Sequence, residues 1–281
     1  MTNPAIAEIR AYYERNTALF QLLSRGRQSY AIHRAVWLDQ TVDYAAALRY
    51  VNDTIGVVLE PLIEHTGGAG LRLIDLGCGI GGTVIDLARR YRGSLKAIGI
   101  SISPAQLRLA QHNAALAGVV CRFVEADYLQ PPFGPCFDLA IAIESFIHAP
   151  AYRDAIIAAA RLLAPGGQLI ICDDFLAETA SAGDRRVATF MRGWHAPGLT
   201  HVSRVRQAAA AAGLTLCEQR DLTVGLRLHP SPDRVAETLL QLTAPLPQQW
   251  RLSQSLIGSM ALQQCLHHGS IRYQWLRFVR Q

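Results

Sequence analysis

Residues 71–84 of this 281-residue chain read LRLIDLGCGIGGTV and indicate its fold class. An apolar run containing Asp75 is followed by four glycines and, from Thr83, by a helical pattern. Parallel α/β sheets bind nucleotide-like ligands at such strand–turn–helix junctions, because glycine lets the backbone turn sharply and lie against the ligand. We therefore expect the turn to bind a ligand through Gly77, Cys78, Gly79, Gly81 and Gly82.

Strand and helix patterns alternate beyond this turn. The apolar runs predict strands at 71–76, 95–100, 120–125, 137–143, 168–172, 214–220 and 270–279. Helical patterns at 83–91, 104–117 and 151–163 lie between runs among the first five, which predicts parallel strands with right-handed crossovers. Strands that are apolar along their whole length are typical of a sheet covered on both faces. The chain is thus expected to form an α/β fold with a mostly parallel, seven-stranded sheet.

The remaining segments predict additions to this sheet. Residues 1–66 carry helical patterns and are expected to form an N-terminal cap, and Gly67, Gly68 and Gly70 mark its boundary. Residues 67–281 then form the main domain. Within it, the looser patterns at about 174–200 and 233–268 predict a lid insertion and a helical insertion.

The composition narrows the class of partner. The net charge is +5, and all basic residues except Lys96 are arginine. Arginine binds carboxylate and phosphate groups well, so an anionic substrate is one interpretation; a GC-rich genome that favours arginine codons is the other. The arginines are scattered, so we do not expect a nucleic-acid partner.

The six cysteines are widely spaced and form no CxxC pair, which favours free thiols in a reducing cytoplasm. No apolar run reaches 18 residues, so we expect no membrane insertion. The sequence leaves open whether the chain forms a homo-oligomer.

Two cofactors are compatible with the glycine turn, NAD(P) and S-adenosylmethionine. Gly77, Gly79 and Gly82 satisfy the dinucleotide pattern G-x-G-x-x-G. Asp75, however, would repel a pyrophosphate and could instead accept the ammonium group of S-adenosylmethionine.

Later segments resemble class I S-adenosylmethionine-dependent methyltransferases. These are EADYLQPPF at 125–133, FDLAIAIESFIHAP at 137–150 and LLAPGGQLIICDD at 162–174. The resemblance implies a Rossmann-like fold, with Asp127 accepting from the adenine amino group and Tyr128 lining the ring.

One stretch narrows the resemblance. Most class I enzymes end the second strand with an acidic residue, but here AIGISISPAQL places Ser101 there. This is similar to the sterol C-methyltransferase and cyclopropane-fatty-acid synthase group, in which Gln106 would hold the ribose beside Ile102. IESFIHAP and the N-terminal QSYAIHRAVW resemble the same group, which implies that Tyr30 lies over the methionine portion of the cofactor.

C-methylation of an alkene requires a base and an apolar wall around a carbocation. Glu144 follows the apolar run at 137–143 and is expected at the carboxyl edge of the sheet, where isoprenoid C-methyltransferases similarly use a glutamate as base. Alternatively, Glu144 only orients a neighbouring group. His148 is either a second acid–base group or a hydrogen-bonding strut.

The expected acceptor is a prenyl diphosphate such as isopentenyl or geranyl diphosphate, with Mg²⁺ accompanying the diphosphate although no metal motif is present. Residues expected to bind it are Tyr13, Arg27, His33, Arg34, Trp37, Phe146, Arg192 and Trp194. The alternative is O- or N-methylation of a natural-product scaffold with a histidine base. A non-catalytic cofactor-binding subunit is disfavoured because all these elements are present. An RNA methyltransferase is disfavoured because the Asn/Asp-Pro-Pro-Tyr tetrapeptide is absent after the fourth strand.

Overall fold

A computed structural model describes residues 10, 33–38, 41–65, 70–230, 238 and 251–281. These residues form a seven-stranded sheet in the order β3-β2-β1-β4-β5-β7-β6. Its strands are β1 (Leu71–Leu76), β2 (Leu95–Ser101), β3 (Arg122–Glu125), β4 (Phe137–Ile143), β5 (Leu163–Leu176), β6 (Leu214–Asp221) and β7 (Ile271–Arg280). Strands β1 to β5 pair in parallel, whereas β7 runs antiparallel to both β5 and β6.

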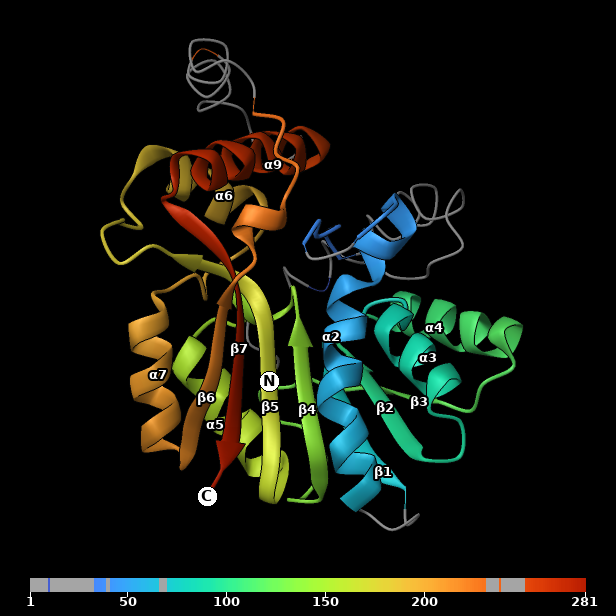
Figure 1. Cartoon of the computed structure of the whole chain (residues 1–281). Helices are drawn as coiled ribbons and strands as arrows, with labels where there is room; N and C mark the ends of the chain where they lie inside the picture. Colours follow the sequence, from blue (N-terminus) through green and yellow to red (C-terminus); the bar gives the residue numbers. More distant parts are fainter. Residues whose placement is uncertain (1–9, 11–32, 39–40, 66–69, 231–237, 239–250) are drawn as a thin grey trace.

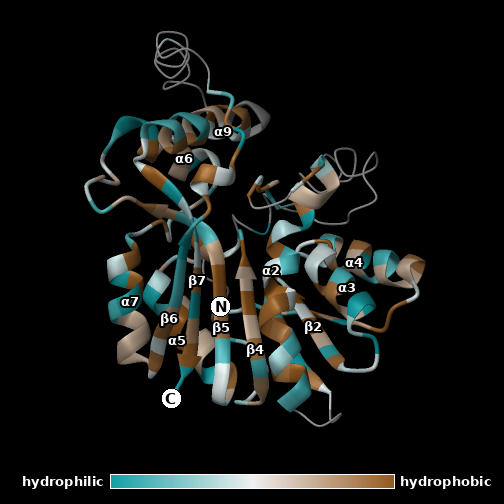
Figure 2. Ribbon diagram, in the orientation of Figure 1, coloured by the Kyte–Doolittle hydropathy of each residue, from teal (hydrophilic) through white to brown (hydrophobic). Residues whose placement is uncertain are grey.

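Helices cover both faces of the sheet (Figure 1). One face carries α2 (Tyr44–His65), α3 (Gly82–Arg90) and α4 (Pro104–Ala117). The other face carries α5 (Tyr152–Leu162) and α7 (Val202–Ala211). Figure 2 shows the central strands mainly in the hydrophobic colour and the outer helices banded in both, as expected for amphipathic helices on a buried sheet.

The apolar runs in the strands explain why both faces are covered. Successive side chains of a strand point to opposite faces, so Leu73 and Ile74 of β1 enter different hydrophobic clusters. Both side chains are completely buried. Burying a side chain of this size contributes about 1.5–3 kcal/mol, so each face of the sheet contributes to stability.

A helix pair lies at the edge where the parallel strands end (Figure 1). It consists of α6 (Arg185–Gly193) and α9 (Arg251–His268), which pack against each other. Gly258 permits the close approach, since a Cβ atom there would lie 2.8 Å from the Trp194 side chain and 3.0 Å from Gly193 Cα. A segment at residues 33–38 lies at the same edge and hydrogen-bonds from Trp37 N to Gly225 O in the short 3₁₀ turn η2 (Thr223–Gly225).

The predicted fold class, with a mostly parallel sheet of seven strands, is confirmed, with differences in detail. Strand β5 is longer than the predicted 168–172 because it pairs with β7 as far as Leu176. The looser segment at 174–200 contains α6, whose N-cap Asp184 accepts hydrogen bonds from two backbone N–H groups. The predicted helices before residue 33 and between 239 and 250 lie outside the described residues.

Candidate active site

The glycine turn follows β1 at the carboxyl edge of the sheet. Gly77 and Gly81 have positive φ angles of 91° and 86°, which glycine adopts without a steric cost. The N–H groups of Gly77 and Cys78 both donate to Ile100 O, at 3.0 and 2.9 Å. A Cβ atom at Gly77 would lie 2.6 Å from Ser145 Cβ, so this turn packs directly against the end of β4.

Asp75 is a buried carboxylate beside the turn. It is 4% exposed, and burial raises its pKa to about 7. Among the described residues, no Lys, Arg or His side chain forms an ion pair with it. A carboxylate in such a position would be stabilised by a cationic group of a ligand. The Asp75 carboxylate therefore fits a cofactor that carries an ammonium or sulfonium group.

The end of β2 brings Ser101 and Gln106 together. Ser101 Oγ donates to Gln106 Oε1 at 3.1 Å and accepts from Ser103 N at 3.2 Å, and both side chains are buried. Ser103 is the N-cap of α4 and accepts from Gln106 N, as its sequence position predicts. Because Gln106 Oε1 accepts from Ser101, its amide nitrogen can donate to a ribose hydroxyl. Ile102, between them, is half-buried.

Asp127 and Tyr128 follow β3 on the same edge. Asp127 Oδ1 accepts from Leu129 N at 2.9 Å, and burial raises the pKa of this carboxyl. The Tyr128 hydroxyl donates to Ser145 O at 3.0 Å, and burial raises its pKa, so it stays a hydrogen-bond donor. Ser145 Oγ in turn donates to Leu76 O at 2.5 Å. Ser145 therefore ties the ends of β1, β3 and β4 together.

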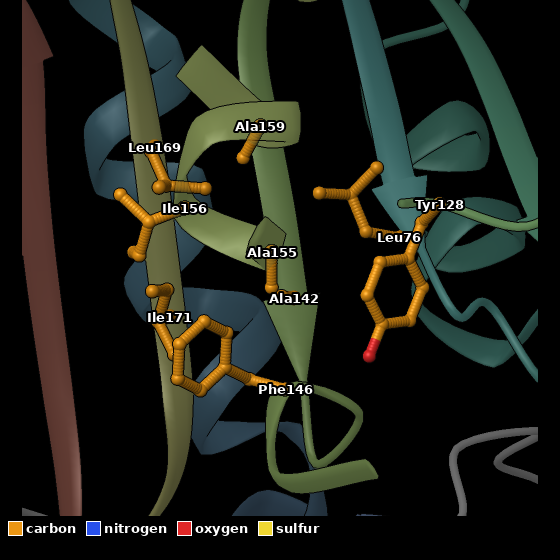
Figure 3. Close-up of a pocket in the computed structure, with 9 residues that line it drawn as sticks. All are labelled: Leu76, Tyr128, Ala142, Phe146, Ala155, Ile156, Ala159, Leu169 and Ile171. Carbon is orange, nitrogen blue, oxygen red and sulfur yellow. The ribbon is translucent and has the colours of Figure 1, made fainter. Parts of the chain in front are cut away.

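An apolar cavity lies behind Tyr128, on the face covered by α5. Figure 3 shows its lining residues: Leu76, Tyr128, Ala142, Phe146, Ala155, Ile156, Ala159, Leu169 and Ile171. Phe146 is 4% exposed and packs on Phe175 with ring centroids 6.2 Å apart. Its side chain thus belongs to the core on this face, and its contact with an acceptor stays a prediction.

Glu144 follows β4 with an unusual backbone conformation. Its φ angle is +50°, in the left-handed region that non-glycine residues rarely adopt. Its N–H donates to Cys172 O at 2.9 Å. Its Oε1 accepts from Tyr273 Oη at 2.9 Å and from the backbone N of Arg34 at 2.8 Å. The structure thus places Glu144 at the carboxyl edge, as predicted, and fixes one of its two oxygens.

The Arg34 side chain forms an ion pair with a buried carboxylate. Its guanidinium forms two hydrogen bonds to Asp174, at 2.6 and 2.5 Å, and lies 4.8 Å from the centre of the Tyr273 ring. The two side chains are 17% and 0% exposed. Burial opposes the charge of Arg34, but the pairing with Asp174 outweighs this effect and raises the pKa of Arg34. Its charge is therefore neutralised within the protein.

His33 also makes an internal contact. Its Nε2 lies 3.2 Å from Asn52 Oδ1, and Asn52 Nδ2 donates to Asp86 at 2.9 Å. These contacts attach the segment at 33–38 to α2 and α3. The neighbouring Trp37 ring lies 3.2 Å from the Arg227 guanidinium carbon, in a cation–π arrangement.

His148 lies in the 3₁₀ turn η1 (Phe146–His148) after β4. It is buried, and its Nδ1 lies 2.9 Å from His195 O. A carbonyl can only accept, so Nδ1 carries the hydrogen and the lone pair of the neutral ring is on Nε2. Burial lowers the pKa of His148, which favours this neutral form. Asp173 fixes the turn, since its Oδ2 accepts from the N–H groups of Phe146 and Ile147 at 2.7 and 3.2 Å.

The other predicted acceptor residues are spread over a wider area. Trp194 Nε1 donates to Ser259 Oγ at 3.1 Å and packs on Phe190, which joins α6 to α9. Arg192 is exposed on α6. The predicted acceptor residues Tyr13 and Arg27, and the predicted cofactor residue Tyr30, lie outside the described residues.

Four site residues were not predicted: Ser145, Asp173, Asp174 and Tyr273. Consecutive aspartates inside the apolar run that forms β5 were a usable signal, because charged residues are seldom buried without a partner. Tyr273 carries no comparable signal, since it is one aromatic among several in β7.

Two further features of the described residues concern metal binding and membrane insertion. In the described part of the chain, no three His, Cys, Asp or Glu side chains are grouped so that they could hold a metal ion. Of the helices that the structure describes, none is long and apolar enough to span a bilayer.

Comparisons with known proteins find methyltransferases. Residues 73–167 match the family described as "Methyltransferase domain". The O-methyltransferase rstn1 of Aspergillus nomiae is 32% identical over 62% of this chain and 74% of its own. The O-methyltransferase resE of Aspergillus sclerotiorum is 25% identical over 80% of this chain and 82% of its own. The 24-methylenesterol C-methyltransferase 2 of Arabidopsis thaliana is 29% identical over 54% of this chain and 44% of its own.

A solved structure shares the fold over the whole chain. Geranyl diphosphate C-methyltransferase from Streptomyces coelicolor A3(2), in complex with Mg²⁺, geranyl diphosphate and S-adenosyl-L-homocysteine, superposes with a TM-score of 0.65 at 17% identity. The superposition covers 100% of this chain and 99% of that enzyme. This superposition shows the shared fold, while the family match and the 32% identical relative identify the chain as a member of the class I S-adenosylmethionine-dependent methyltransferases.

Proposed function

We propose that this methyltransferase acts on a hydroxyl oxygen of a small natural product and that His148 removes the hydroxyl proton. The relatives that cover most of this chain are O-methyltransferases, which favours this reaction over methylation of a prenyl diphosphate. The observation that supports His148 as the base is its geometry. Its Nδ1 is held 2.9 Å from His195 O and burial lowers the pKa of the ring, so the neutral ring carries its lone pair on Nε2.

The cofactor residues take the roles that their positions suggest. Asp75 faces the ammonium group, and the turn at 77–82 lies along the methionine portion. Gln106 and Ser101 hold the ribose, with Ile102 beside them, while Asp127 and Tyr128 contact the adenine. S-adenosylmethionine, when bound there, supplies a methyl group on a positively charged sulfur.

The reaction needs one proton acceptor and close alignment. The acceptor oxygen forms a bond to the methyl carbon as the carbon–sulfur bond breaks, and the electron pair of that bond stays on sulfur. His148 Nε2 takes the proton from the same oxygen. Glu144 lies four positions before His148 in the sequence, and two hydrogen bonds hold its Oε1 atom. Its second carboxylate oxygen is proposed to orient the acceptor.

C-methylation of an isoprenoid alkene, with Glu144 as the base, is the second candidate. It is supported by the unusual φ angle and the two hydrogen bonds that fix Glu144, and by the sterol C-methyltransferase relative. Two observations weigh against a diphosphate acceptor. Arg34 is neutralised by Asp174, and the described residues offer no group of side chains for Mg²⁺.

The test uses labelled S-adenosylmethionine with a panel of phenols, aliphatic alcohols, amines and prenyl diphosphates. We expect label in a hydroxyl acceptor, and His148→Asn should lower kcat for it by about 10²- to 10⁴-fold with unchanged cofactor binding. Since neutral His148 is the active form, kcat should fall only when the pH drops below the lowered pKa of His148. Label in prenyl products alone, abolished by Glu144→Gln and retained in His148→Asn, would replace this proposal with the second candidate.

A further inference from the structure

Four side chains from separate parts of the chain meet beside the predicted acceptor position. We call Arg34, Glu144, Asp174 and Tyr273 the Arg34 cluster. We propose that Arg34, Asp174 and Tyr273 are positioning residues that set the orientation of the Glu144 carboxylate. The inference rests on the proposed function in one respect, that the acceptor lies beside Glu144.

Glu144 needs such support because of its backbone. A non-glycine residue in the left-handed region persists only when its surroundings hold it there. The Glu144 N–H is bonded to Cys172 O, and the Oε1 atom receives two donors from elsewhere in the chain. Among the described residues both donors reach Oε1, so Oε2 is the oxygen that remains for a hydrogen bond from the acceptor.

Arg34 holds Glu144 through its main chain and is itself held through its side chain. The backbone N–H donates to Glu144 at 2.8 Å, while the guanidinium makes two bonds to Asp174. A bidentate arginine–carboxylate pair is rigid in distance and angle, because both groups are planar. We infer that Asp174, which makes no hydrogen bond to Glu144 itself, helps to hold the Arg34 N–H in place through this pair.

Strand pairing fixes the other two members. Asp174 of β5 and Tyr273 of β7 are direct cross-strand partners, so their Cα atoms have a set spacing. From this register the Tyr273 ring covers the Arg34 guanidinium and its hydroxyl reaches Glu144 at 2.9 Å. Burial and the neighbouring Cys172 and Glu144 raise the pKa of Tyr273, so its hydroxyl remains a donor. The paired residues Asp174 and Tyr273 thus support the two groups that donate to Glu144 Oε1, the Arg34 N–H and the Tyr273 hydroxyl.

The test is a double-mutant cycle between Asp174 and Glu144, measured with the hydroxyl acceptor that the panel identifies. Asp174→Asn should lower kcat by about 10- to 100-fold, since it loosens a donor to a charged group, and should leave the Kd for S-adenosylmethionine unchanged. The same substitution in a Glu144→Gln background should have almost no effect, because the carboxylate that it positions is gone. Tyr273→Phe should lower kcat in the same way.

Two further variants separate positioning from folding. Asp174→Asn leaves Arg34 buried and unpaired, which is destabilising, so the pair Arg34→Met with Asp174→Leu replaces both charges by apolar groups of similar size. This double variant should fold and bind cofactor but show the same loss in kcat. Glu218→Gln is the matched control, because it breaks the ion pair with Arg277 (2.8 Å) between β6 and β7 and should leave kcat unchanged.

The result that would overturn the inference is an Asp174→Asn effect of equal size with and without Glu144, or a Glu144→Gln variant with normal kcat. A normal Glu144→Gln variant would leave O-methylation by His148 intact. If the wild-type protein methylated no hydroxyl acceptor in the panel, the proposed function would be contradicted instead. The two failures are therefore distinguishable.

Discussion

The strands β1 to β3 and the strands β4 to β7 hold their site residues in different ways. Around β1 to β3 the contacts are local: Ser101 bonds a residue five positions later, and the glycine turn bonds the next strand. Around β4 to β7 the contacts join distant positions: Arg34 and Glu144 are 110 positions apart, Arg34 and Asp174 are 140 apart, and Glu144 and Tyr273 are 129 apart. The residues between 75 and 128 that we propose to contact the cofactor are thus held mainly by contacts with nearby positions, whereas the proposed acceptor side is assembled from distant segments.

The strongest test of this difference concerns stability and Asp75. Its pKa is 3.8 in an unfolded chain and about 7 in the fold, so the cofactor-free protein should lose stability as the pH rises from about 4 to about 7. The full loss is at most roughly 4 kcal/mol. Asp75→Asn should be more stable than the wild type at pH 8 and should lack this pH dependence, measured by urea unfolding without cofactor. If the unfolding free energy of the two proteins had the same pH dependence, the pKa of Asp75 would not be raised in the fold.

The second test concerns cofactor affinity at the same residue. The ionised carboxylate pairs with the ammonium group, so the affinity for S-adenosylmethionine should rise as the pH increases through about 7. Asp75→Asn should weaken binding by about 10- to 100-fold at pH 8, measured by calorimetry. Asp138→Asn, at the opposite end of β4 in a partly exposed pair with Arg72, is the control and should bind normally.

The third test compares two glycines of the same turn. Both Gly77 and Gly79 have positive φ, but only at Gly77 would a Cβ atom meet a neighbour, 2.6 Å from Ser145 Cβ. Gly79→Ala should cost about 1 kcal/mol in unfolding free energy from backbone strain alone. Gly77→Ala should cost at least about 1 kcal/mol more, because it pushes the turn away from β4. Equal losses would mean that the turn and β4 are not packed tightly.

The smallest expected effect comes from Tyr128, which joins the two groups of strands. Tyr128→Phe keeps the ring and removes the hydrogen bond to Ser145 O, worth about 1 kcal/mol. We expect a cofactor Kd within about twofold of the wild type and a several-fold lower kcat, because Ser145 adjoins Glu144. A change in Kd without a change in kcat would place the effect of this bond on the cofactor side alone.

The same difference explains what could be predicted from the sequence. The glycine turn after a strand and the cap at Ser103 were predictable because their interactions lie within short segments with strand, turn and cap patterns. Glu144 and His148 were predictable in position, since they follow an apolar strand. The partner of Arg34 was not, because a buried aspartate 140 residues away decides where its charge goes. Helix α6 was missed because a short amphipathic segment beside glycine and polar residues resembles a loop.

The antiparallel strand β7 also affects the order of folding. It lies between β5 and β6, yet ribosomes synthesise it after the other six strands. Until then β6 has no neighbour in the sheet, and the edge of β5 stays open to pairing with other chains. The donor of Tyr273 arrives with the same strand, so a nascent chain can already form its cofactor turn while Glu144 is still unsupported. The turn proposed to bind the methyl donor is therefore synthesised before the strand that completes the proposed acceptor site.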